Sequence, residues 1–133
     1  MKYMLMMHVP GGTGDYQIRH WAPEDLKAHM NHMHRLNQEL IDTGERVDGQ
    51  GLTPPAQAKL VRAGKGGAPV TDGVFPEAKE FLAGYWIVDV DRPGRAYEIA
   101  AKTSAAPGPG GKPLIIPIEV RQVMSPPPGE VYS

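Results

Sequence analysis

Hydrophobic and polar residues recur along the chain with the period of a strand in some segments and of a helix in others. Strands are expected at residues 2–9, 45–50, 59–62, 81–90 and 114–124. Helices are expected at residues 23–43 and 93–103, where apolar residues fall at helical spacing. Clusters of glycine and proline separate these segments, so the pattern predicts a mixed α and β chain with short connections.

The longer helix should begin at Pro23, because proline suits the first turn, and Glu24 and Asp25 favour the positive end of a helix. Gly44 can adopt the left-handed conformation that ends it. At about 100° per residue, one narrow stripe is expected to enter the core. Its members are Leu26, Met30, Met33, Asn37 and Leu40.

The two C-terminal strands differ in their patterns. Residues 81–90 are rich in aromatic and β-branched residues and are expected at the centre of the sheet. The last strand alternates between two faces. Its apolar row is Ile116, Ile118, Val120 and Met124, and its second row is Glu119, Arg121 and Val123.

The order of the segments predicts an α+β fold of the ferredoxin-like type, βαββαβ, with an inserted hairpin. Asp72-Gly73, a dipeptide typical of tight hairpin turns, is expected to turn inside this insertion, and residues 64–67 to form a glycine-rich tip. Two helices cover only one face of such a sheet, and a bare apolar second face would aggregate. A symmetric homodimer is therefore expected, packed face to face or edge to edge.

Length and composition exclude several classes of protein. The 133 residues are expected to form one domain at 1–124 with a proline-rich tail at 125–133. Fourteen Lys and Arg balance fifteen Asp and Glu, so no excess positive charge favours nucleic acid or an anionic membrane. The absence of cysteine excludes disulfides and thiolate chemistry. The first apolar run is too short for a membrane helix, and a cytoplasmic location is expected.

Four segments of the chain carry a family resemblance: residues 1–5, 51–52, 70–90 and 118–124. They resemble the DGPF-type proteins of the YCII-related family. The family's Asp-Gly-Pro-Phe appears here as Asp72-Gly73-Val74-Phe75, which loses a fixed φ angle but keeps the Asp-Gly pair. The resemblance implies a dimeric α/β-barrel type of fold, and it implies much less about function.

The resemblance also implies candidate catalytic residues. Broader relatives include proposed lyase- or dehalogenase-like enzymes with a His and Asp pair in a cleft, which would correspond to His34 and Asp48, with Met33 as an alternative at the histidine position. In such a pair Asp48 would orient the imidazole of His34, which would act as a general base. Asp72 of the loop motif is a third candidate, although a turn-forming role is favoured for it.

Further polar and aromatic residues are candidates for holding a ligand: His8, Tyr85, Trp86, Glu119 and Arg121. Trp86 is equally typical of a core position, and strand charges more often form structural ion pairs.

Three histidines lie on the long helix, and His29 and His32 could share a metal ion, but no partner carboxylate is evident and no metal site is predicted. At helical spacing His34 lies about 140° from His29, so these two and His32 cannot converge on one ion and are expected to flank the core stripe. The chain also lacks a glycine-rich phosphate loop in a strand-to-helix context, and no cofactor is predicted.

The leading hypothesis is a homodimeric accessory protein that holds a small ligand in a cavity lined by the sheet. The alternative is an enzyme of the YCII type that uses His34 and Asp48, or a histidine with Asp72, for acid–base chemistry on a small organic acid. A third hypothesis follows from the resemblance, because some family members are encoded beside sigma factors of the extracytoplasmic-function class. A regulatory partner of such a sigma factor would expose a broad apolar patch instead of a pocket.

Overall fold

The computed structural model describes residues 1–10, 20–53, 57–73 and 80–125. The helices are α1 (Pro23–Asp42) and α2 (Pro93–Ser104). The strands are β1 (Lys2–Pro10), β2 (Arg46–Gly51), β3 (Lys59–Ala63), β4 (Pro69–Gly73), β5 (Glu80–Asp89) and β6 (Ile118–Gln122). Neither helix among these residues is long and apolar enough to cross a lipid bilayer.

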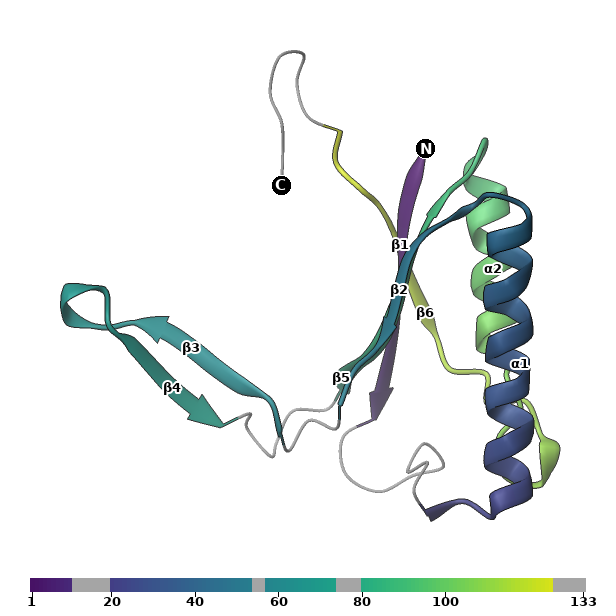
Figure 1. The fold of residues 1–133 in the computed structure, drawn as a ribbon, viewed down its shortest axis with the longest axis horizontal. Coiled ribbons are helices and arrows are strands. Elements are labelled where there is room, and N and C mark those ends of the chain that lie inside the picture. Colours follow the sequence, from purple (N-terminus) through teal and green to yellow (C-terminus); the bar gives the residue numbers. More distant parts are fainter. Residues whose placement is uncertain (11–19, 54–56, 74–79, 126–133) are drawn as a thin grey trace.

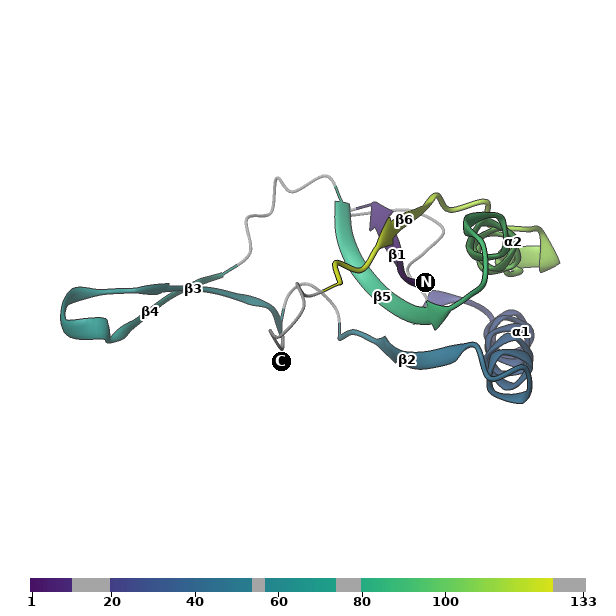
Figure 2. The same cartoon turned by 90° about the horizontal axis from the view of Figure 1, so that it is seen from above.

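Four strands form one antiparallel sheet in the order β2-β5-β1-β6, and both helices cover the same face of it (Figures 1 and 2). The pair β3 and β4 forms a separate two-stranded hairpin inserted between β2 and β5. Without the hairpin the chain runs βαββαβ, so the predicted α+β, ferredoxin-like fold with an inserted hairpin is confirmed.

The core lies between the sheet and the helices and follows the period-two pattern of the strands. Tyr3 and Leu5 of β1 lie opposite Val88 and Trp86 of β5, and all four side chains are buried. The helices contribute further buried residues: Leu36, Leu40, Ala96, Ile99 and Ala100. The predicted central position of the strand at 81–90 is confirmed, since β5 pairs with both β1 and β2.

The buried stripe of α1 differs from the predicted one. His29, Leu36 and Leu40 are its buried residues, while Met30 is 41% exposed. At about 100° per residue the buried stripe lies roughly 60° from Leu26, on the side that faces α2. The buried stripe is rotated from the predicted one because α1 packs against α2 and the segment that follows α2. There His29 and His32 hydrogen-bond to the carbonyl oxygens of Pro107 and Lys102.

The turn predicted at Asp72-Gly73 was wrong, and so was a turn-forming role for Asp72. Both residues belong to β4, where Asp72 lies opposite Leu60. The hairpin turns at its glycine-rich tip, where Gly66 and Gly67 have φ angles of 70° and 81°. Two consecutive glycines adopt this left-handed region without steric cost, so they decide where the chain reverses.

The last strand is shorter than predicted, because it begins at Ile118. The backbone amides of Leu114 and Ile115 donate to the carbonyl oxygens of Ala106 and Ser104 at the end of α2, at 2.9 Å each, and so leave the sheet. Ile116 is buried as expected, but the apolar row does not continue to Met124, which is 79% exposed.

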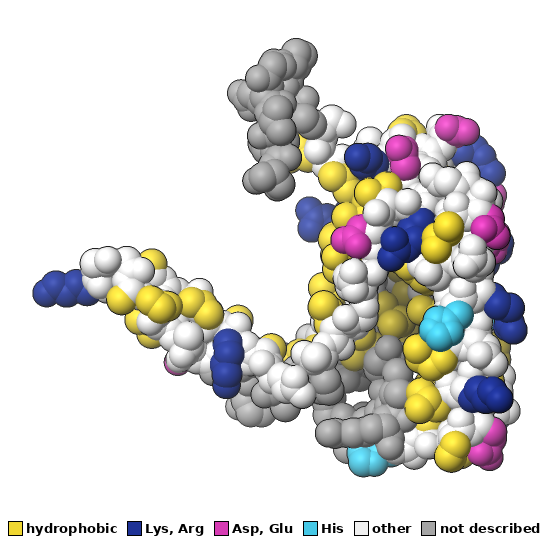
Figure 3. Space-filling model, in the orientation of Figure 1, with side chains coloured by type: hydrophobic (Ala, Val, Ile, Leu, Met, Phe, Trp, Pro, Cys, Tyr) yellow, Lys and Arg dark blue, Asp and Glu magenta, His cyan; other side chains and the backbone are white. Residues whose placement is uncertain are grey.

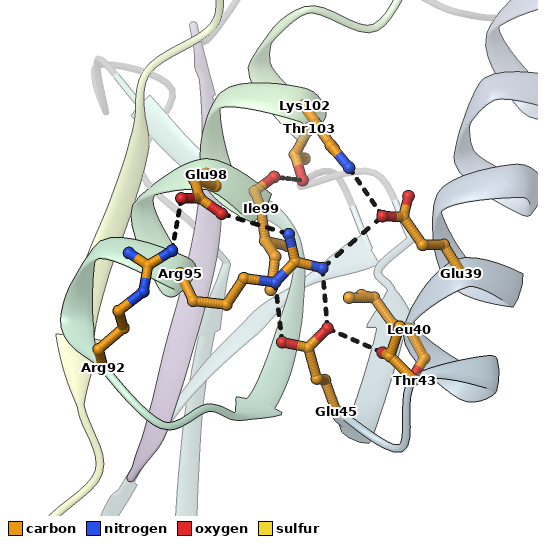
Figure 4. Close-up of polar contacts among 10 residues, drawn as sticks. All are labelled: Glu39, Leu40, Thr43, Glu45, Arg92, Arg95, Glu98, Ile99, Lys102 and Thr103. Carbon is orange, nitrogen blue, oxygen red and sulfur yellow. Dashed lines mark hydrogen bonds and ion pairs between the residues drawn. The ribbon is translucent and has the colours of Figure 1, made fainter.

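Ion pairs fasten the two helices to the start of β2 (Figure 4). Arg95 of α2 donates hydrogen bonds of 2.8 Å from Nε and Nη2 to the two carboxylate oxygens of Glu45. Lys102 donates to Glu39 of α1 at 2.7 Å, and the same carboxylate lies 3.6 Å from Arg95. These contacts hold α1 and α2 side by side at the end of the sheet where β2 begins.

Several predicted features lie outside the described residues. They are the chain after Pro10 up to residue 19, Val74 and Phe75 of the family motif, and residues 126–133 of the expected tail.

Candidate functional site

A cavity of about 500 Å³ lies between α1 and the helix-facing side of the sheet. Leu5, Met7 and Trp86 of the sheet line it on one side, and Met30 and Met33 of α1 line it on the other. Figure 3 shows the hollow beside α1, with hydrophobic side chains inside it and a histidine at its edge. Its size and apolar walls are typical of a site for a small organic molecule.

Three of the five members of the stripe predicted for α1 form a wall of this cavity, whereas Leu40 is buried in the core as predicted. Met30, Met33 and Asn37 lie within about 60° of one another on the helix, and all three line the cavity. The hydrophobic pattern identified the apolar face of α1, but α2 packs against the face of α1 beside it. The part of the expected stripe farther from α2 therefore remains open to the cavity.

Arg46 brings a positive charge to the cavity. Its Nε donates to Oδ1 of Asn37 at 2.7 Å, and its Nη2 donates to the carbonyl oxygen of Gly49 at 3.2 Å. Both acceptors are neutral, and Arg46 forms no ion pair within 4 Å with a carboxylate of the described chain. Asn37 was the one polar member of the predicted stripe, and this hydrogen bond explains its place there.

Trp86 and Gly49 pack closely at the same site. A Cβ atom at Gly49 would overlap the indole of Trp86, so glycine is needed where the ring lies against β2. The indole Nε1–H makes no hydrogen bond within the described residues, yet no fully buried side-chain nitrogen there lacks a partner. This N–H therefore remains accessible, on a residue that is both core and cavity wall.

His29 is a buried histidine that lines the cavity, whereas the sequence analysis expected it to flank the core stripe. Its Nδ1 lies 3.0 Å from the carbonyl oxygen of Pro107, and its ring meets Trp21 edge to face at 5.3 Å. A carbonyl oxygen can only accept, so Nδ1 carries the proton. Burial lowers the pKa of His29, and the hydrogen bond to Pro107 opposes that effect only in part.

His34 and Asp48 are not brought together. His34 is exposed on α1 and lines the cavity, but it makes no hydrogen bond with another described residue. Asp48 lies opposite Ile87, one residue from Gly49, so its side chain leaves the sheet on the face away from the helices. There it accepts a hydrogen bond of 2.9 Å from the hydroxyl of Tyr85.

The hydrogen bond between Asp48 and Tyr85 shifts their pKa values in opposite directions. The donated hydrogen bond of Tyr85, followed by that of the Gly49 amide, lowers the pKa of Asp48. The same hydrogen bond raises the pKa of Tyr85, because losing the phenolic proton would place two negative charges together.

The other predicted site residues lie in three separate parts of the structure: the helix-free face of the sheet, the hairpin and the cavity. His8 lies 3.0 Å from Glu119, and Glu119 lies 3.9 Å from Arg121, on the helix-free face of the sheet. Asp72 pairs with Arg62 at 3.0 Å on the exposed hairpin. Of the five predicted ligand-binding residues, only Tyr85 and Trp86 line the cavity, so the five do not share one cavity in the described structure.

Sequence reasoning missed Arg46 and Gly49 as site residues. In the sequence both look like ordinary members of a short strand. No spacing rule predicts a contact between Arg46 and Asn37, which lies nine residues earlier on another element. The one available signal was Asn37, a polar residue inside an apolar stripe, since a buried amide requires a partner.

The chain matches a known protein family over most of its length. The family model of the YCII-related domain matches residues 1–110, from β1 past the end of α2. The chain is similar to the uncharacterized protein R00369 of Rhizobium meliloti (strain 1021), with 27% identity over 113 residues, which are 85% of this chain and 87% of that protein. The matched region contains α1, β1, β2 and β5, which supply most of the cavity wall. The chain belongs to the family of the YCII-related domain.

Proposed function

We propose that this protein binds a small, mainly apolar molecule in the cavity between α1 and the sheet. The supporting observation is a hollow of about 500 Å³ whose walls are apolar while a few polar groups converge on it. The hollow opens at the surface beside α1 (Figure 3). Pre-formed clefts of this volume with mostly apolar walls and a few polar groups are the usual form of sites for small molecules.

An uncharged dye tests this proposal without assuming a ligand. N-phenyl-1-naphthylamine becomes fluorescent in apolar surroundings, and we expect it to bind with one site per chain. The variant Met33→Trp fills the cavity and should abolish the signal. The matched control Asn31→Trp places the same ring on the exposed side of α1 and should leave binding unchanged. Equal binding by both variants, with circular dichroism showing both folded, would place the dye elsewhere and reject the cavity as the site.

We also propose that the protein works as a homodimer. The helix-free face of the sheet presents Met4, Met6 and Ile87, and the β3–β4 hairpin projects on this same side (Figure 2). On the hairpin Leu60 and Val61 are 46% and 59% exposed. An isolated two-stranded hairpin is marginal in water, so apolar residues on it favour a covering partner. A two-fold operation lets the face and the hairpin of each copy cover those of the other.

Sedimentation velocity tests the dimer directly. We expect the wild-type protein to sediment with twice the chain mass, and Ile87→Lys to sediment as a folded monomer because it places a charge in the proposed interface. Asn31→Lys on the outer side of α1 should stay dimeric. A wild-type monomer at high protein concentration would reject the proposal.

Other hypotheses stay predictions from the sequence: the DGPF subtype, the cytoplasmic location and the association with a sigma factor. Acid–base catalysis on a small organic acid would have to use His34 without Asp48, because the carboxylate is hydrogen-bonded to Tyr85 on the other side of the sheet.

A further inference from the structure

We infer that the ligand of this cavity carries a carboxylate group and that the guanidinium of Arg46 binds it. This inference rests on the proposed function and specifies the chemical class of the ligand. It follows from the charges around the cavity, from the unused hydrogen-bond donors of Arg46, and from the way Arg46 is held.

The charge balance at the cavity favours an anion. Arg46 is the only Lys or Arg among the described lining residues, and none of those residues is Asp or Glu. Among the other described arginines, Arg62, Arg92, Arg95 and Arg121 each lie within 4 Å of a carboxylate. Arg35 does not, but it is exposed on α1 and does not line the cavity. Asp48 is close enough for the charge of Arg46 to lower its pKa, but it forms no ion pair with Arg46 within 4 Å and does not line the cavity. On the cavity side the guanidinium lies beside apolar walls, where an anionic ligand stabilises its charge.

The donors of Arg46 that remain unused suit a carboxylate. A guanidinium has five N–H groups, and two of them are used by Asn37 and the carbonyl oxygen of Gly49. Three N–H groups remain, and the end edge of the guanidinium carries one from Nη1 and one from Nη2, while the other N–H of Nη1 points toward the Cδ side. Two parallel N–H groups along this edge match the two oxygens of a carboxylate.

Asn37 and Gly49 act on Arg46 from two different elements. Asn37 holds Nε from α1, and the Gly49 carbonyl holds Nη2 from β2. A side chain restrained at two points loses little further entropy when it binds a ligand. Asn37 is thus a positioning residue for Arg46, and Trp86 adds an accessible N–H donor in the same wall.

The walls also restrict the body of the ligand. The cavity lining includes Leu5, Met7, Met30 and Met33, which suit an aliphatic or aromatic group. A single arginine neutralises a single negative charge, so a monocarboxylate fits better than a phosphate dianion. The geometry points to a small hydrophobic acid.

Displacement of the dye by a matched acid and amide tests the inference. The probes are 4-phenylbutyrate and 4-phenylbutyramide, which have the same body and differ in charge. On the wild-type protein we expect the acid to displace the dye at a concentration about ten-fold or more below that of the amide, since hydrogen bonds to charged groups are the stronger ones. Equal displacement by both probes would overturn the inference and leave the proposed function standing. Failure of the dye itself to bind would instead reject the proposed function.

Variants of Arg46 and Asn37 test whether Arg46 causes the preference for the acid over the amide. Arg46→Gln should bind the dye and the amide as before and lose the preference for the acid, whereas Arg46→Lys should retain part of it. Asn37→Ala keeps the charge and should reduce the preference by an intermediate amount. The control Arg62→Gln removes a positive charge from the hairpin and should change nothing. If Arg46→Gln no longer binds the dye, Arg46→Lys decides, because it must then favour the acid for the inference to survive. A full preference in Arg46→Gln would overturn the inference.

Discussion

Arg95 and Glu45, fifty residues apart in the sequence, form a two-pronged ion pair with both hydrogen bonds at 2.8 Å. Both side chains are mostly buried, with 22% and 16% of their surface exposed. The hydrogen bonds from Arg95 lower the pKa of Glu45 and raise that of Arg95, so both groups stay charged near neutral pH. This pair fixes α2 against the start of β2, next to the wall that carries Arg46.

Arg95→Met should lower the free energy of unfolding by roughly 1–3 kcal/mol, because it leaves Glu45 partly buried without its partner. Urea denaturation measures this value. The control Arg92→Met breaks the exposed pair with Glu98 and should cost about 0.5 kcal/mol or less. Equal losses in the two variants would contradict a special role for Arg95.

The stability of the folded protein should decrease as the pH is lowered, over a range set by the pKa of His29. Burial keeps the pKa of this imidazole below its ordinary value of 6.5, so the unfolded chain takes up the proton first as the pH falls. The stabilisation is therefore complete above about pH 6.5 and is lost as the pH falls toward the folded-state pKa. Thermal melts between about pH 7.5 and pH 5 should show the loss, and His29→Gln should flatten the curve. The control His20→Gln, at an exposed position, should retain the wild-type slope.

Gly49 should tolerate no side chain while Trp86 is present. Gly49→Ala should be destabilising by about 1–3 kcal/mol, because the added Cβ meets the indole. Gly51→Ala on the same strand is the control, since nothing lies within 4 Å of a Cβ there. Trp86→Ala alone should cost about 3–5 kcal/mol as a core truncation.

A double-mutant cycle separates the contact between Gly49 and Trp86 from general damage. In the Trp86→Ala background the further change Gly49→Ala should cost much less than in the wild type. Additive losses in chemical denaturation would show that the two sites do not meet.

Tyr85→Phe should raise the pKa of Asp48, because the largest cause that lowers it is the hydrogen bond from the Tyr85 hydroxyl. Carboxyl-carbon NMR titration of Asp48 measures the change. In the reverse experiment Asp48→Asn should bring the raised pKa of Tyr85 down, followed by phenolate absorbance. The control Glu119→Gln, on the same face but bonded to His8, should leave both pKa values unchanged.

The sequence determined the elements and their order. Period-two and period-3.6 patterns predicted both helices and the strands of the sheet, because these periods depend on local backbone geometry that the residues themselves favour. Pro23 and Pro93 begin the two helices as proline at a first helical position should. The ferredoxin-like order follows from the elements, since few ways of connecting them remain.

Only the tertiary structure decided which neighbouring face of α1 is buried and which lines a cavity. Both Leu36 and Met30 lie on the apolar half of the helix, and the position of α2 separates them. The same holds for the site. The sequence singled out His34 and Asp48, which fold onto different sides, whereas Arg46 gained its role from Asn37 on another element. Contacts between elements depend on packing at a distance, and local pattern contains no information on them.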